Sequence, residues 1–182
     1  ASLATQGGLI LDTWLATGMA SPVVMATATW SGDRSLVEYC FCETGPCSNA
    51  DAAAGCANSS GAGAELHARG STQHAADDLV LLASGLLPSQ PALLFAANNS
   101  LSGGNGVLFG DGLRCAGGGV VRLGVSVPDA GGSASWGPGL ASAGGWSAGD
   151  VRYLQAWYRD PVGGPCGFGF NLSHSLEAVL TP

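Results

Sequence analysis

The sequence predicts an all-β protein, a disulfide-stapled antiparallel β-sandwich of jelly-roll type. Short apolar runs alternate, residue by residue, with small or polar residues, as in strands that bury one face. Thirty glycines among 182 residues, together with Pro, Asn and Asp, separate these runs as turns do. Six cysteines, an even number, provide for disulfide bonds. About ten short strands in one domain favour a jelly-roll sandwich over a barrel.

The strand pattern is clearest in three runs, residues 64–69, 120–128 and 151–159, where apolar side chains recur at every second position. Shorter or more uniformly apolar runs predict the remaining strands. These are Leu9 to Leu15, Val23 to Trp30, Leu36 to Phe41, Asp78 to Ala83, Ala92 to Ala96, Val107 to Phe109 and Leu176 to Thr181.

The cysteines form one group of four and two isolated residues: Cys40, Cys42, Cys47 and Cys56, then Cys115 and Cys166. We expect all six in disulfides, with Cys115 joined to Cys166 and two bridges inside residues 40–56. The sequence does not predict which of Cys40, Cys42, Cys47 and Cys56 pair with each other. A zinc site built from the first four is less favoured, because their spacing lacks the paired C-x2-C units of thiolate zinc sites.

Charge excludes several classes of function. The formal net charge is -7, with six arginines and no lysine, so a surface that follows nucleic-acid phosphates is not expected. No apolar run reaches the roughly 18 residues that suggest a membrane span. Together with oxidised cysteines, these features predict a secreted protein, extracellular or at the cell surface.

From Tyr39 onward the chain carries several distinctive motifs in order: YCFC, PC, GCANSSGAGA, FGDGLRCAGG, YLQAWYRDP and PCGFGFNLS. In these motifs it resembles a group of uncharacterised secreted bacterial proteins, often C-terminal domains of larger surface proteins. The resemblance implies an extracellular, disulfide-bonded β domain and no assigned activity. Residues 1–30 lie outside it. We therefore expect an N-terminal extension, residues 1–30, and a β-sandwich domain, residues 31–182.

One pattern is typical of hydrolases. Residues 145–149 match the G-x-S-x-G elbow around Ser147, and Asp160 and His174 follow in the order of a catalytic triad. An elbow needs a strand before the serine and a helix after it, whereas a Gly/Ala loop precedes Ser147 and a strand is predicted to follow. We therefore expect no catalytic residues and no enzyme activity.

Metal and cofactor sites are not predicted. Asp77 and Asp78 are adjacent, so in a strand their side chains point to opposite faces, and turn or strand-end roles are expected. The loop Gly110 to Gly112 has oxygen ligands for calcium but no EF-hand pattern. The histidines are dispersed and are expected to face solvent: His67, His74 and His174.

Tryptophans suggest a possible sugar-binding surface. Trp136 and Trp146 lie in glycine-rich, loop-like sequence and are the candidate glycan-binding residues, whereas Trp157 lies in an alternating strand and is expected in the core.

Three functions follow from these patterns. The first is a non-catalytic structural subunit of an extracellular surface or filamentous assembly that self-associates through a strand from residues 1–30, using Leu9, Leu11 and Leu15 or Val23, Met25 and Thr27. The alternatives are a carbohydrate-binding module for polysaccharide and a secreted hydrolase.

Overall fold

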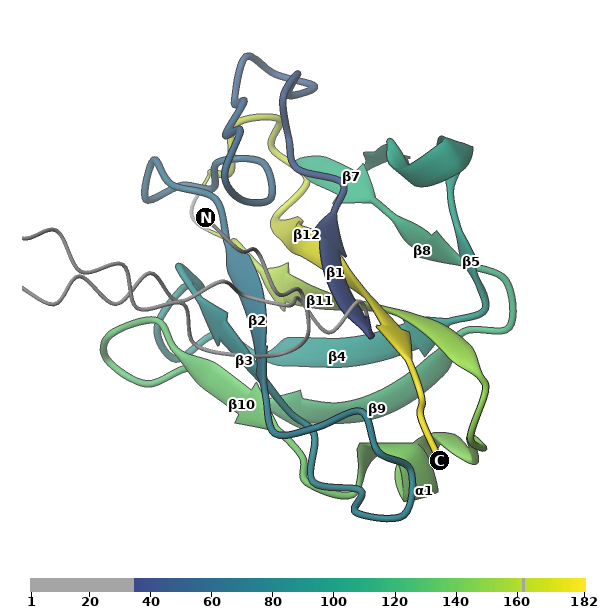
Figure 1. The fold of residues 1–182 in the computed structure, drawn as a ribbon. Coiled ribbons are helices and arrows are strands. Elements are labelled where there is room, and N and C mark those ends of the chain that lie inside the picture. The colour runs from purple at the N-terminus through teal and green to yellow at the C-terminus, as the bar shows by residue number, and fades with distance from the viewer. Residues whose placement is uncertain (1–34, 162) are drawn as a thin grey trace, which may run out of the picture. The chain divides into compact units, whose positions relative to one another are not determined.

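The computed structural model describes residues 35–161 and 163–182 (Figure 1). In these residues the chain forms antiparallel sheets joined by three disulfides, which confirms the predicted all-β class. The predicted extension, residues 1–30, and the strands expected within it lie outside the described residues.

The larger sheet has five strands, and every neighbouring pair is antiparallel. Their order is β1 (Leu36–Tyr39), β12 (Phe170–Val179), β11 (Val151–Arg159), β4 (Ala92–Ala97) and β9 (Val121–Ser126). The two longest strands, β11 and β12, lie next to each other in the middle (Figure 1). The outer edges therefore belong to β1 and β9.

A three-stranded sheet has the order β10 (Ala134–Trp136), β3 (Val80–Ser84) and β2 (Glu65–Arg69). The core contains side chains from both sheets. Leu94 and Leu154 of the larger sheet belong to the same buried cluster as Leu66 and Leu81 of the smaller one. Both sheets thus bury one face in a shared core, as alternating strands require.

Smaller elements complete the described chain. Two short hairpins pair β5 (Asn99–Ser100) with β8 (Ala116–Gly117), and β6 (Val107–Phe109) with β7 (Gly112–Arg114). A 3-10 turn, η1, spans Ser102–Gly104, and a short helix, α1, spans Leu140–Gly144. Among the described residues no helix is long and apolar enough to cross a membrane.

The sequence missed the shortest elements, and it placed the start of β12 too late. β5, β7, β8 and β10 have two or three residues, too few to show an alternating pattern, whereas the equally short β6 was predicted from its uninterrupted apolar run. β12 begins at Phe170 rather than Leu176, because Asn171 and Ser173 are polar and yet buried. The jelly-roll strand order is not confirmed by the two sheets.

All six cysteines are paired, as predicted, but the predicted pairing is wrong. The bonds are Cys40–Cys115, Cys42–Cys56 and Cys47–Cys166. Cys115 therefore does not pair with Cys166, and only one bridge lies inside residues 40–56. Cys115 and Cys166 are each isolated along the sequence, but this does not make them partners in the folded chain.

Packing of the cysteine-rich loop explains this pairing. Asn49 Nδ2 in this loop donates to the carbonyl of Asp111 at 2.7 Å, and Ser59 N donates to the Asp160 carboxylate at 2.8 Å. This loop, residues 40–63, therefore lies against the segments just before β7 and just after β11. This packing places its cysteines within bonding distance of Cys115 and Cys166.

Candidate functional site: an aromatic groove

A groove of about 400 Å³ lies on the outer face of the larger sheet. Residues of β4 alternate between the two faces, so Leu94 and Ala96 enter the core while Leu93 and Phe95 face outward. Trp157 of β11 lies on the same outer face, because its neighbour Tyr158 belongs to the core. The lining residues are Leu93, Phe95, Phe109, Arg114, Val120, Arg122, Trp157 and Leu172.

The groove exists because the short hairpins cover only part of this face. Hairpin β6–β7 supplies Phe109 and Arg114 as one wall, and β7 packs against β12. Toward the β9 edge the described chain provides no such cover. Val125, which pairs with Leu93 across the strands, is 67% exposed. The apolar outer face therefore continues from the groove to the edge of the sheet.

Phe170 is the centre of an aromatic cluster in and beside this groove. Its ring centroid lies 5.2 Å from that of Phe109, 5.7 Å from that of Trp157 and 6.4 Å from that of Phe168. On the far side of Phe109 lies a second hollow of about 390 Å³, also lined by Phe168 and Phe170. Leu108, at its rim, is 69% exposed. Two apolar hollows thus flank Phe109.

Arginines are the only charged residues that line the groove. The Arg114 guanidinium lies 5.9 Å from the centroid of Phe109, and its Nε donates to the carbonyl of Ala116 at 3.1 Å. The side chain of Arg122 forms no hydrogen bond or ion pair with any residue that the structure describes. The groove therefore combines aromatic rings, aliphatic side chains and free positive charge.

Comparison of the chain with protein-family models, with curated proteins and with solved structures gave no match. The groove is therefore interpreted from its own chemistry.

The tryptophans are arranged differently from the prediction. Trp136 and Trp146 are each only 6% exposed, and both belong to the core cluster. Trp136 Nε1 donates to the carbonyl of Gly124 at 3.0 Å. Neither indole presents a face on which a sugar ring can stack, which argues against the predicted glycan-binding role. Trp157, expected in the core, is partly buried: it packs against a second buried cluster that contains Phe95 and Leu172, and it also lines the groove.

The three residues of the hydrolase pattern lie in separate places. Ser147 follows α1 and precedes β11, so the strand and helix of an elbow are in the wrong order. Its backbone N–H donates to Asp150 at 2.9 Å. The Asp160 carboxylate instead accepts hydrogen bonds from Ser59, and the His174 ring packs against Phe41. The structure does not bring these residues together as a triad.

The acidic residues singled out from the sequence have local structural partners. Asp77 accepts hydrogen bonds from Ala141 N and Ser142 N at the start of α1, whereas Asp78 accepts bonds from Ser71. In the loop Gly110 to Gly112, Asp111 is buried, and its carboxylate accepts a hydrogen bond from Phe168 N at 3.0 Å. These contacts hold neighbouring loops in place.

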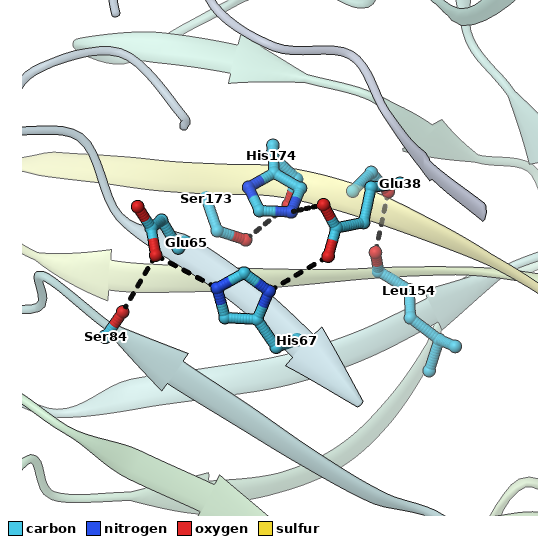
Figure 2. Close-up of polar contacts among 8 residues, drawn as sticks. Glu38, Glu65, His67, Ser84, Leu154, Ser173 and His174 are labelled. Carbon is cyan, nitrogen blue, oxygen red and sulfur yellow. Dashed lines mark hydrogen bonds and ion pairs between the residues drawn. The ribbon is translucent and has the colours of Figure 1, made fainter. Parts of the chain in front are cut away.

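A cluster that the sequence did not predict joins two histidines (Figure 2). Glu38 on β1 accepts a hydrogen bond from His67 Nδ1 on β2 at 2.9 Å, and Glu65 Oε2 lies 3.0 Å from His67 Nε2. These bonds, that of Glu65 first, raise the pKa of His67 above its ordinary value. The ring of His174 on β12 lies 6.0 Å from that of His67. The histidines were expected to be dispersed, but strand packing brings these two together.

His174 was also expected to face solvent, and this is wrong. It is fully buried, and neither ring nitrogen has a hydrogen-bond partner within the described chain. Burial lowers its pKa, so the neutral ring is favoured. In their present positions, no three described His, Cys, Asp or Glu side chains form a ready metal site.

Proposed function

We propose that this chain is a non-catalytic structural protein of an extracellular assembly, in which one subunit contacts the next through the aromatic groove. The observation that carries the proposal is the composition of that groove. Aromatic residues and arginine are enriched in the centres of protein–protein interfaces, where lysine, glutamate and aspartate are depleted. Trp157, Phe109 and Arg122 follow this preference, and no acidic side chain lines the groove.

The surface around the groove supports a protein partner over a sugar. Val125 and Val127 on one side and Leu108 and Phe168 on the other are large apolar side chains that are mostly exposed. Contiguous apolar surface of this kind is typical of sites that a protein partner covers. A sugar site needs several polar groups, acceptors among them, to bind hydroxyls, whereas the polar groups of the lining side chains are all donors, those of Arg114, Arg122 and the indole of Trp157.

The proposed occupant of the groove is the segment 1–30 of a second copy. Asp12 is the single charged residue of this segment, and Arg122 has no acidic partner among the described residues. Because β9 is the last strand of its sheet, a donated strand can add beside it and place alternate apolar side chains over the groove. Burying four aliphatic side chains contributes roughly 6–12 kcal/mol before ordering costs.

The three disulfides support an extracellular location for the proposed assembly, because such bonds persist in oxidising environments outside the cell. The proposal therefore places the chain outside the cell, as a secreted or surface protein. A bacterial source is part of the same proposal and rests on the sequence resemblance, whereas the filamentous form of the assembly rests on the low surface charge and the apolar N-terminal segment.

The test is the mass of the native particle, measured by sedimentation over a range of concentrations. We expect the full chain to self-associate and Val125→Asp to weaken that association, because a charge then lies beside the groove. Val37→Asp is the matched control, since Val37 is also exposed but lies on the opposite edge strand, β1. Leu11→Asp and Met25→Asp, in the full chain, tell which half of residues 1–30 is donated.

Two outcomes overturn the proposal. One is a chain that stays monomeric at all concentrations, and the other is a Val125→Asp variant, folded by circular dichroism, that associates as the unchanged protein does. Binding of the monomer to an insoluble polysaccharide, lost in Trp157→Ala, would instead support the carbohydrate-binding alternative.

A further inference from the structure

Two of the three disulfides are closed to solvent. Cys42 and Cys56 are completely buried, so a reagent reaches their bond only when the surrounding chain opens. In the Cys40–Cys115 bond, Cys115 is completely buried and Cys40 is only 9% exposed. Gln155 Nε2 lies 3.2 Å from the Cys115 sulfur, so the amide also covers that sulfur. Both bonds are therefore protected in the folded protein.

The third disulfide, Cys47–Cys166, is accessible. Cys47 is the only exposed cysteine of the six, and Cys166 is half-buried. Both residues line the second hollow of about 390 Å³, beside Phe109. Leu108 and Phe168, which also line this hollow, are 69% and 63% exposed, so the hollow is open to solvent. A small molecule in solution can therefore reach this bond while the chain stays folded.

The two segments that this bond joins are also held together without it. Asn49 Oδ1 accepts a hydrogen bond from Cys47 N at 3.2 Å, and Asn49 Nδ2 donates to the carbonyl of Asp111 at 2.7 Å. The Asp111 carboxylate accepts a hydrogen bond at 3.0 Å from the backbone N–H of Phe168, two residues after Cys166. Asn49 and Asp111 thus connect the two segments noncovalently. Breaking the sulfur–sulfur bond should leave both segments near their folded positions.

We propose that Cys47–Cys166 is a thiol-exchange site, at which a low-molecular-weight thiol becomes attached to Cys47. The thiolate of the small thiol attacks Cys47 Sγ, because Cys47 is the more exposed half of the bond. A new sulfur–sulfur bond forms at Cys47, and the bond from Cys47 to Cys166 breaks. Its electron pair leaves with Cys166 as a thiolate, which can take a proton from water. The small thiol is the only co-reactant of this step.

The retained position of Cys166 makes the modification reversible. After exchange, the Cys166 thiolate remains beside the mixed disulfide on Cys47, because Asn49 and Asp111 still connect the two segments. When the free small thiol is removed, this thiolate attacks Cys47 Sγ, re-forms the original bond and expels the small thiol. The extent of modification therefore follows the thiol concentration around the protein.

Peptide mapping after timed exposure to 2-mercaptoethanol tests the proposal. The folded full chain is treated with this thiol, and free cysteines are then blocked with N-ethylmaleimide before digestion. At early times we expect 2-mercaptoethanol on Cys47 and maleimide on Cys166. This modification should be at least about tenfold faster than any at the other four cysteines, because buried bonds exchange only after local opening. Removal of the thiol by gel filtration before blocking should return the unmodified chain.

Two double variants, checked for folding by circular dichroism, form a matched pair of controls. Cys47→Ala combined with Cys166→Ala should take up no small thiol. Cys42→Ala combined with Cys56→Ala removes a buried bond instead and should keep the fast exchange at Cys47. Mapping of the unchanged protein decides the question if either variant does not fold.

Three outcomes of that mapping overturn the proposal. One is the absence of any modification in the folded chain. Another is simultaneous modification of all six cysteines, which would mean that exchange requires unfolding. The third is earlier modification of Cys40–Cys115 or Cys42–Cys56 than of Cys47–Cys166.

Discussion

Gln155 and Cys115 connect the larger sheet to the hairpin that forms the wall of the groove. Gln155, fully buried on β11, accepts a hydrogen bond from Cys115 N at 2.9 Å through its side-chain oxygen. Its amide nitrogen donates to the carbonyls of Leu113 at 2.9 Å and Ser173 at 2.8 Å. One side chain therefore fixes β7, β12 and the Cys40–Cys115 disulfide to the centre of the sheet.

Replacing Gln155 with leucine should destabilise the protein by about 2–4 kcal/mol. Leucine has a similar size, but it leaves several buried backbone groups without partners, and each unsatisfied group costs roughly 1–3 kcal/mol. Urea unfolding measures the effect. Gln73→Leu is the control, because Gln73 is exposed and its side chain has no hydrogen bond with the described residues. A change within about 0.5 kcal/mol for Gln155→Leu would contradict this role.

The sequence predicted features that depend on neighbouring residues and missed those that depend on packing. Alternation located the strands around Leu66, Val125 and Trp157, because the period of two is local. It did not show which face of β11 meets the other sheet, so it did not show that Trp157 packs against the smaller buried cluster on the groove side rather than in the core between the sheets. Trp136 and Trp146 were assigned to exposed loops because glycines surround them, but a glycine-rich segment can also pack tightly against the core.

The candidate site was missed for a related reason. Phe109, Phe170 and Arg122 are far apart in the chain and carry no common motif. Only the folded sheet and the hairpin over it place them at one groove. The same holds for His67 and His174, whose contact depends on the approach of β2 to β12.

Peptide mapping without reduction should find three cross-linked peptides that contain Cys40–Cys115, Cys42–Cys56 and Cys47–Cys166. Replacing both Cys47 and Cys166 with alanine should cost more stability than replacing Cys42 and Cys56, because the sequence separations are 119 and 14 residues. Chain entropy gives about 4.7 kcal/mol for a loop of ~100 residues and about 3 kcal/mol for one of ~15. A Cys115–Cys166 peptide would contradict the pairing.

Three Asn-x-Ser/Thr sequons are present, and only one should carry a glycan when the protein is made in a host that glycosylates. Asn58 and Asn171 are buried, and their side-chain nitrogens donate to backbone carbonyls. Asn98 is exposed. Because glycans occupy surface asparagines, intact-mass measurement should show at most one glycan, lost in Asn98→Gln. A glycan on the folded protein at Asn171 would contradict the burial of that strand.

Acid should remove a stabilising contact between Asp77 and α1. Burial alone would raise the pKa of this carboxyl group, but hydrogen bonds from Ser142 and Ala141 outweigh it and hold the pKa below its usual value of 3.8. A carboxyl group with a lowered folded-state pKa stabilises the protein above its unfolded-state pKa. That stabilisation is lost as the pH falls through the folded-state value.

Asp77→Asn measures this contribution, because asparagine tolerates the positive φ of 44° at this position and removes the charge together with one of the two accepted hydrogen bonds. At pH 7 the variant should be less stable by about 0.3–1 kcal/mol, the range for an anion at a helix N-terminus. The difference in unfolding free energy should shrink as the pH falls below 3.8, because wild-type Asp77 then becomes neutral too. Glu43→Gln, which removes a carboxylate without a hydrogen bond to the described residues, should show no such trend. A difference that stays constant down to pH 2 would mean that the charge of Asp77 does not stabilise α1.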